Sequence, residues 1–291
     1  MTSILLLHPG EMGASVGAAL GSVGHEVLWV AAGRSPQTAR RAAASGLTAV
    51  PTLTDGTGSD VVVSVCPPAA APGVAAEVAR CGFAGIYVDA NAISPITSVD
   101  MAELLAARGI AYVDGGIVGP PARVDGTTRL FLSGERAAEV AALWEGSVLG
   151  TVVTDGGVGA ASAVKMCFAS STKVHSALLL AIAATASHHG VLDDLLAEWD
   201  RRGDGRRAAL ERAASGSALK AWRWVGEMDE IAATFATADQ PAGFGLAAGQ
   251  LFARLRDGSD ADPVAGLAEV LAALTAPPAA ADEGSLAGQD P

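Results

Sequence analysis

Six residues near the start of the chain, His8-Pro9-Gly10-Glu11-Met12-Gly13, have the types and spacing of a phosphate-binding turn. An apolar run at 4–7 precedes them and predicts a buried parallel strand, and the small residues at 14–20 predict a helix. In a dinucleotide site, Gly10 lets the backbone approach the pyrophosphate and Gly13 lets the helix pack on the strand. Because His8 replaces the first glycine of the usual G-x-G-x-x-G, the motif is incomplete.

The segment after the second predicted strand indicates which dinucleotide binds. A site for NAD normally carries an acidic residue about 20 residues after the glycines, which bonds the ribose 2′-hydroxyl. Residues 27–54 contain no Asp or Glu, and the strand is followed by Gly33-Arg34-Ser35. A guanidinium and a hydroxyl suit a 2′-phosphate, so Arg34 and Ser35 predict NADP(H) over NAD(H). The alternative is that Arg34 is a solvated loop charge and that Arg40 and Arg41 form a polar helix face.

Lys165 and Asn91 are the candidates for catalysis. Lys165 stands near the start of a long apolar helix, just after a glycine-rich linker. Desolvation favours the neutral amine and suits proton transfer, although a lysine more often extends to solvent. Asn91 follows Asp89 at the end of a predicted strand, where its amide either orients a substrate or the nicotinamide ribose, or only forms a turn.

Two further segments carry polar groups at helical spacing. Glu227 and Glu230 share a predicted helix face, from which they either present carboxylates to Lys165 or a cationic substrate, or form a solvated acidic face. Thr172 lies seven residues after Lys165 on the same face, and it borders either the site or solvent. His188-His189-Gly190 resembles a helix C-terminus, not a metal site, because adjacent histidines point in different directions.

The elements that must position these residues alternate in the first half of the chain. Apolar runs at 61–65, 85–88, 110–113, 129–132 and 151–153 predict strands separated by helix-length segments. This is the pattern of an α/β fold, a doubly wound parallel sheet (Rossmann). The polar and glycine residues that follow its strands should meet in one crevice, because ligands bind at the carboxyl ends of such sheets; they are Cys66-Pro67-Pro68, Asp89-Ala90-Asn91 and Asp114-Gly115-Gly116.

The second half of the chain has a different sequence pattern. From residue 160 to about 189 the chain has neither Pro nor Gly, which predicts a helix of roughly 45 Å, and only helical segments follow. We therefore predict an NADP-binding Rossmann domain at 1–155, an all-helical substrate and dimerisation domain at 156–275, and a disordered tail at 276–291. The length and apolar character of the first helix favour a partner subunit.

Composition excludes several classes of partner. The net charge of −12 argues against nucleic acid and anionic membranes, which require basic surfaces. The three cysteines are far apart with apolar neighbours and lack zinc spacing, so we expect reduced thiols and no metal. The four-residue N-terminal apolar run is not a signal peptide, and the longest apolar stretch, 177–186, is too short to span a bilayer. These features predict a cytoplasmic protein.

Taken in their order along the chain, the motifs resemble those of the 6-phosphogluconate dehydrogenase / β-hydroxyacid dehydrogenase / imine reductase superfamily, over about residues 3–275. The resemblance implies hydride transfer between NADP(H) and a small carbonyl, alcohol or imine. It places Lys165 at the family's acid/base lysine and implies a homodimer. The implied cofactor-binding residues are the turn from His8 to Gly13 with Arg34, Ser35, Cys66, Pro67 and Asn91. The matching pieces also include Gly157-Val158-Gly159 leading to Lys165-Met166 and, in the helical half, Trp224-Val225-Gly226-Glu227-Met228.

The chain departs from the family at the positions that bind substrate. The family's Ser-Gly-Gly loop reads Val118-Gly119-Pro120, its Ser/Thr pair reads Asn91-Ala92, and the positions after the lysine read Phe168-Ala169. These departures argue against sugar-phosphate decarboxylation and favour a less polar substrate. The expected substrate contacts are Val118, Gly119, Pro120, Phe168, Thr172 and Met228.

Three functions follow from these observations. The first is an NADP-dependent oxidoreductase acting on a small hydroxyacid or carbonyl, with Lys165 as proton donor. The second is an NADPH-dependent imine reductase in which the acidic groups near Glu227 recognise a cation; the presence of Lys165 argues mildly against it. The third is a catalytically silent NADP(H)-binding sensor, suggested by the altered substrate loop.

Overall fold

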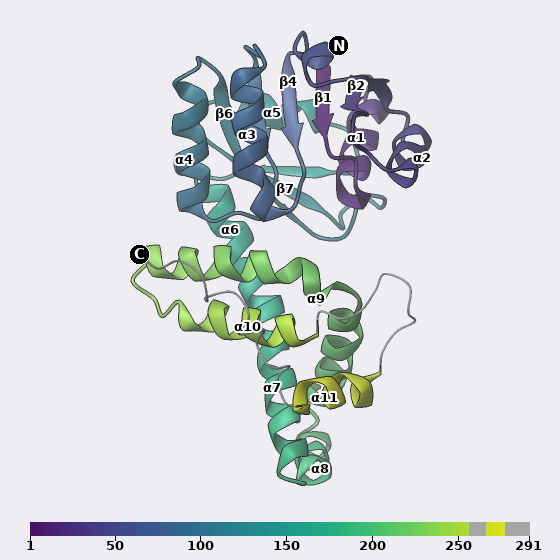
Figure 1. Cartoon of the computed structure of the whole chain (residues 1–291), viewed down its shortest axis with the longest axis vertical. Helices are drawn as coiled ribbons and strands as arrows, with labels where there is room; N and C mark the ends of the chain where they lie inside the picture. The colour runs from purple at the N-terminus through teal and green to yellow at the C-terminus, as the bar shows by residue number, and fades with distance from the viewer. Residues whose placement is uncertain (256–265, 277–291) are drawn as a thin grey trace, which may run out of the picture. The chain divides into compact units, whose positions relative to one another are not determined.

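The computed structural model of the protein describes residues 1–255 and 266–276 (Figure 1). These residues form two compact units. The first comprises Met1–Ser171 with Gly226–Gly245, and the second comprises Thr172–Val225 with the described residues from Leu246 onward. The tail that we predicted at 276–291 lies outside the described residues, apart from Ala276.

The first unit contains an eight-stranded sheet with helices on its faces, which confirms the predicted doubly wound fold (Figure 1). The strand order is β3-β2-β1-β4-β5-β6-β7-β8, so the chain leaves β1 in one direction and returns to its other side at β4. This reversal creates the crevice in which such sheets bind ligands. The strands are β1 (Ser3–Leu7), β2 (Glu26–Val30), β3 (Thr48–Val50), β4 (Val61–Ser64), β5 (Ile86–Asp89), β6 (Ala111–Val118), β7 (Arg129–Ser133) and β8 (Gly150–Val153).

One strand departs from the all-parallel prediction. β7 runs antiparallel to β6, while every other pair in the sheet is parallel. The ten residues between Val118 and Arg129 are too few for a helical crossover, so the chain turns straight back.

Alternating side chains of the central strands build a core on each face of the sheet. Ile4 and Leu6 of β1 join one buried cluster with the helix at 11–22, while Leu5 and Leu7 join a second cluster with the helices at 71–80 and 95–106. This two-residue period is what a strand covered on both faces requires. The covering helices are α1 (Glu11–Ser22), α2 (Pro36–Ala44), α3 (Ala71–Arg80), α4 (Pro95–Ala106) and α5 (Ala137–Ala141), with short 3₁₀ turns at Thr54–Gly56, Pro68–Ala70 and Ala142–Trp144.

The predicted long helix is present, with one interruption. It consists of α6 (Ala160–Ala169), a π-helical turn (Ser170–Val174) and α7 (His175–His188). This run of 29 residues is long and apolar enough to cross a membrane by length and composition alone, so the prediction of no membrane span from the segment 177–186 was wrong for the whole helical run. However, α6 packs against β6 and is bonded to the sheet, as described below, so the first part of the run belongs to a folded domain.

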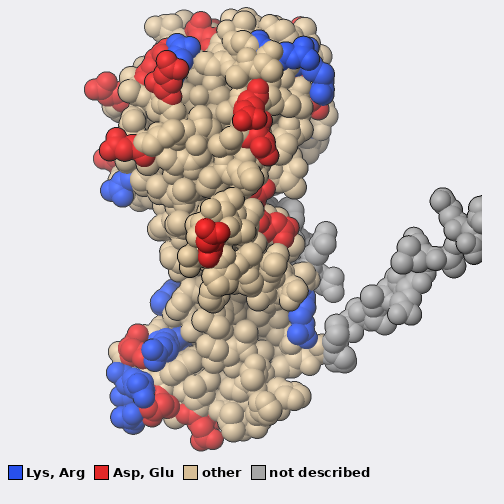
Figure 2. Space-filling model, turned by 90° about the vertical axis from the view of Figure 1, so that its left-hand side faces the viewer, with Lys and Arg blue, Asp and Glu red and all other residues tan. Residues whose placement is uncertain are grey.

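The second unit is helical, as predicted. It contains α7, α8 (Leu192–Arg202), most of α9 (Arg206–Thr237) and of α10 (Gly243–Arg254), and α11 (Leu267–Thr275). Its core joins Leu180 of α7, Trp199 of α8, Leu210 of α9 and Leu271 of α11. Charged side chains gather in small groups separated by wide uncharged surface (Figure 2), and the group at α8 includes Glu198 bonded to two arginines.

Candidate active site at the carboxyl edge of the sheet

The turn between β1 and α1 has the geometry of a dinucleotide-binding loop. The amide of Gly10 donates to the carbonyl of His8 at 2.7 Å. A side chain on Gly10 would meet no atom within 4 Å, so the space beside this backbone is open, whereas a Cβ on Gly13 would clash with the His8 carbonyl. Gly10, the N-cap residue of α1, has no side chain that could cap the helix, so an anion can accept hydrogen bonds from the backbone amides of the first turn. These features fit a pyrophosphate.

His8 adopts a conformation that favours glycine. Its φ of +67° lies in the left-handed region, where the first glycine of the usual motif would be free of strain. Burial and the positive charge of Arg34 lower the pKa of His8 to about 4, an effect that the Leu7 backbone only partly offsets. The imidazole is therefore neutral near physiological pH. Its Nδ1 is buried and makes no well-formed hydrogen bond within the described part of the chain.

Arg34 and Ser35, which we expect at the adenosine end, have different environments. Arg34 is exposed in the loop after β2, and its field lowers the pKa values of both His8 and Cys66. The hydroxyl of Ser35 caps α2 by accepting from the Thr38 amide at 3.2 Å, so this residue already has a structural role. Arg41, which we considered only as part of a polar helix face, donates from Nη1 to the Pro9 carbonyl at 3.4 Å and so braces the turn.

Asn91 connects the ends of β4 and β5. Its Oδ1 accepts from the Cys66 amide at 2.5 Å, and its Nδ2 donates to Ser64 at 3.1 Å and to Asp89 at 2.6 Å. Since the side chain is buried and both of its amide atoms are engaged, Asn91 positions the loop that contains Cys66 and Pro67. Burial raises the pKa of Asp89 to about 7 and that of the Cys66 thiol to about 11.

Asp114, at the edge of the same crevice, fastens α6 to the sheet. Its carboxylate accepts from the backbone amides of Gly159 and Ser162, each at 3.0 Å, and from the hydroxyls of Ser98, Ser133 and Ser162 at 2.9, 2.9 and 2.5 Å. Gly159, the N-cap of α6, has no side chain, so Asp114 performs the capping role from β6. Sequence reasoning placed Asp114 at a strand end but missed this function.

Lys165 lies where α6 passes closest to β6. A Cβ on Gly116 would stand 2.7 Å from the Cβ of Lys165 and 2.8 Å from the Ala161 carbonyl oxygen, so this approach requires glycine in the strand. The Nζ atom of Lys165 is 4.0 Å from Oε1 of Glu227, and only 18% and 7% of the two side chains are exposed. The Glu227 carboxylate therefore faces Lys165 and does not belong to a solvated acidic face.

Glu230 has a different role from Glu227. Its Oε2 accepts from the Ser94 amide at 2.7 Å and from the Thr97 hydroxyl at 2.9 Å, both in the first turn of α4. The carboxylate therefore caps α4 and joins it to α9. Of the two glutamates, Glu227 therefore faces Lys165, and Glu230 fixes α4 to α9.

Comparison with known proteins decides the family. The NAD binding domain of 6-phosphogluconate dehydrogenase matches residues 6–145, and a domain of unknown function, DUF1932, matches residues 186–255. A conserved protein of unknown function, MTH1747, whose structure was described as similar to 3-hydroxyacid dehydrogenases, is 30% identical, with 88% of this chain and 97% of that protein covered and a TM-score of 0.65. This chain belongs to the 6-phosphogluconate dehydrogenase / β-hydroxyacid dehydrogenase / imine reductase superfamily. It therefore has the NAD(P)-binding domain of a dehydrogenase or reductase.

Two solved structures show the same fold at lower identity, and one further protein matches this chain in sequence over about half of each length. Mycobacterium tuberculosis 3-hydroxyisobutyrate dehydrogenase, solved with L-serine, is 20% identical with a TM-score of 0.66, covering 95% of this chain and all of that one. An imine reductase of Bacillus cereus is 16% identical with a TM-score of 0.54, covering 87% of this chain and 93% of that one. An uncharacterised 28.5 kDa protein of Methanothermus fervidus is 32% identical over 138 residues, which are 47% of this chain and 52% of that protein.

The residues at the superfamily's substrate positions are spread over several elements. Val118 ends β6, and Gly119 follows it with a φ of +126°. The adjoining Pro120 is exposed and accepts a hydrogen bond from Thr128 at 2.6 Å. Phe168 of α6 is 46% exposed and provides an apolar surface three residues after Lys165, whereas Met228 is fully buried. Thr172 lies in the π-helical turn and belongs to the second unit.

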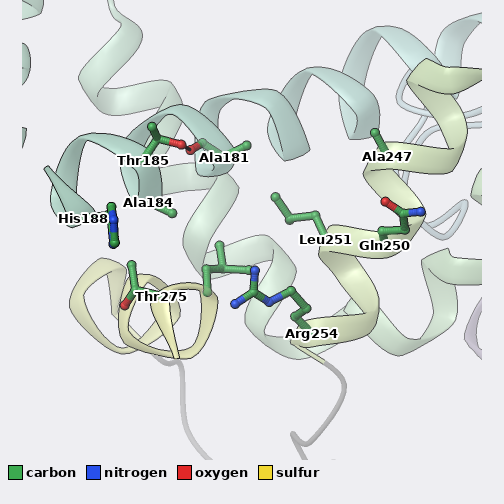
Figure 3. A pocket seen from close by; sticks show the side chains of 10 residues that line it. Ala181, Ala184, Thr185, His188, Ala247, Gln250, Leu251, Arg254 and Thr275 are labelled. Atoms are coloured by element: carbon green, nitrogen blue, oxygen red, sulfur yellow. Dashed lines mark hydrogen bonds between the residues drawn. The ribbon is translucent and has the colours of Figure 1, made fainter. Parts of the chain in front are cut away.

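A cavity of about 450 Å³ lies within the helical unit, between α7, α10 and α11 (Figure 3). Its polar lining includes His188, Gln250 and Arg254. The Arg254 side chain extends toward α11, where its Nη2 donates to the Ala276 carbonyl at 2.6 Å. This arginine thus holds the end of a helix, and the cavity contains none of the superfamily's nucleotide-binding or acid/base positions.

Proposed function

We propose that this protein is an NADP(H)-dependent oxidoreductase that transfers a hydride between the nicotinamide and a small hydroxyacid or carbonyl substrate, with Lys165 as general acid and base. The observation that carries the proposal is the placement of a largely buried lysine, beside a carboxylate, at the sheet edge that also holds the glycine turn. The bound nicotinamide supplies or accepts the hydride. The chain supplies the proton and the geometry.

The proposed acid/base step belongs to Lys165. In the reductive direction, its Nζ donates a proton to the oxygen on which negative charge develops, and in the oxidative direction it accepts the hydroxyl proton. Glu227, whose Oε1 lies 4.0 Å from the Nζ atom, restricts the position of the amine. Asp114 keeps α6, and hence Lys165, in register with the crevice. Phe168 offers the substrate an apolar neighbour.

The preference for NADP(H) is supported by charge. The loop after β2 carries the exposed cation Arg34 and no acidic residue, which favours a 2′-phosphate over a 2′-hydroxyl. The pyrophosphate would lie on the turn from His8 to Gly13, braced by Arg41. Cys66 and Pro67 would border the cofactor from the end of β4, held there by Asn91.

A second activity, imine reduction, is favoured by Glu227 itself. A carboxylate that is 7% exposed at the site would stabilise a cationic substrate such as an iminium ion. The two activities differ in their products, since one forms an alcohol and the other an amine. A panel of carbonyl and imine substrates with NADPH therefore separates them.

The proposal also covers the oligomeric state and the cellular location of the protein. We expect a homodimer in the cytoplasm, with a small-molecule substrate and neither nucleic acid nor membrane as partner. Leu178 and Ile182, four residues apart on one side of α7, are 57% and 37% exposed, which supports a second copy covering this helix. Light scattering at several protein concentrations tests this expectation, and a monomer throughout would overturn it.

Two experiments test the function. A thermal-shift titration should show stabilisation by NADPH and less by NADH, because a ligand at 100 times its Kd stabilises the fold by about 2.7 kcal/mol. Lys165→Met should then lower turnover by orders of magnitude while leaving NADPH binding intact. Lys173→Met is the matched control, because it removes the same charge from the adjoining turn of the helical run. Equal turnover in the two variants would refute the role of Lys165.

A further inference from the structure

In the nucleotide-binding turn, His8 stands where the usual motif has a glycine, and the motif does not explain why this position has a side chain. A residue with a side chain is uncommon at a φ of +67°, and such strain persists mainly where the side chain serves a function. Glycine at this position would relieve the strain and leave the turn intact. The chain instead retains an imidazole with a buried Nδ1.

The strand register places this imidazole beside the end of the site that binds adenosine. In the pairing of β1 with β2, Leu6 lies opposite Trp29, so His8 follows β1 at the level where the chain leaves β2 toward Arg34. In sheets of this type, the group attached to the ribose 2′-oxygen is recognised at the end of β2. The effect of Arg34 on the pKa of His8 shows that the two side chains share one electrostatic environment.

The charges around His8 change when a phosphate enters. Arg34 faces it from the loop after β2, Glu11 begins α1 three residues later, and the thiol of Cys66, neutral at physiological pH, follows β4. Without a ligand, burial and, to a smaller extent, the charge of Arg34 keep the imidazole neutral. A 2′-phosphate, which is close to a dianion above its pKa of about 6, offsets the charge of Arg34 and favours the imidazolium form.

We propose that His8 is a specificity-determining residue, which binds the 2′-phosphate of NADP(H) together with Arg34 and takes up a proton from solvent as the phosphate arrives. This inference rests on the proposed binding of NADP(H) and adds the residue that would couple binding to protonation. It requires that the bound phosphate raise the pKa of His8 from about 4 to above neutrality, and it predicts that the affinity for NADP⁺, but not for NAD⁺, falls as pH rises through this bound-state pKa.

Isothermal titration calorimetry of the full chain tests the inference. NADP⁺ and NAD⁺ are titrated between about pH 7 and 8.5, where the 2′-phosphate remains a dianion, in buffers of different ionisation enthalpy that report net proton uptake. The variants are His8→Asn, since asparagine tolerates positive φ, and His8→Gly, which removes the strain. Both should unfold at or above the wild-type temperature if the turn is intact.

We expect the wild type to take up protons with NADP⁺ and not with NAD⁺. Both variants should lose this uptake, and their NADP⁺ affinity should fall on the order of 10-fold further than their NAD⁺ affinity, because they lose a charge-assisted hydrogen bond to the 2′-phosphate. Equal loss of both affinities, or proton uptake that persists in the variants, would overturn the role of His8 while leaving the dinucleotide site in place. A wild type that binds neither dinucleotide would overturn the proposed function and this inference together.

Discussion

Replacing Asp114 with alanine should destabilise the sheet unit severely, because one carboxylate accepts five hydrogen bonds in the interior. The three serine hydroxyls can rotate toward other acceptors, but the amides of Gly159 and Ser162 cannot. Each buried amide left without an acceptor costs about 1–3 kcal/mol, so the two together cost about 4 kcal/mol. At 2–4 °C per kcal/mol for a protein of this size, the melting temperature should fall by roughly 10 °C.

The assay is urea-induced unfolding of the wild type and two variants, followed by kinetics. Asp60→Asn is the control, because Asp60 accepts a single exposed hydrogen bond from the Ser3 amide and its replacement should cost under about 1 kcal/mol. If Asp114 positions α6, the alanine variant should also have a lower kcat with a smaller change in KM, since Lys165 would shift away from its place in the crevice. A cost for Asp114→Ala as small as that of the control would refute the reasoning.

Three other predictions concern single groups. Burial raises the pKa of Asp89 from 3.8 to about 7, so protonation of Asp89 stabilises the fold fully below about pH 4, and this contribution is lost as pH rises through about 7. Asp89→Asn should therefore flatten the decline of the unfolding free energy, measured with urea, between about pH 4 and 7. An unchanged dependence of the unfolding free energy on pH would contradict the prediction. Gly116→Ala should push α6 away from β6 and lower turnover more than NADPH affinity, because the new Cβ would lie 2.7 Å from that of Lys165; wild-type kinetics would show that the helix tolerates the shift. With the pKa of Cys66 raised to about 11, iodoacetamide should label the exposed Cys167 first at about pH 8, as read by peptide mass spectrometry, and the reverse order would place Cys66 in a different environment.

Local patterns in the sequence were enough to predict most of the fold. The run at 4–7 followed by the glycine turn and small residues predicted β1 and α1, because a buried parallel strand and a helix start each have a short-range signature. The absence of Pro and Gly after residue 160 predicted the long helix in the same way. The π-helical turn within it and the reversal at β7 were not predicted, since neither leaves a periodic mark.

The roles of individual site residues were decided by tertiary structure. Sequence alone identified Lys165, Asn91 and Glu227 as polar groups in suitable elements, but it left open what each one faces. Glu227 meets Lys165 across 62 positions of the chain, and Asp114 caps a helix that begins 46 residues later. Such pairs form because glycines in β6 allow α6 to approach closely and because buried polar groups must find partners. Periodicity determines which elements form, whereas close packing between distant segments determines which side chains meet.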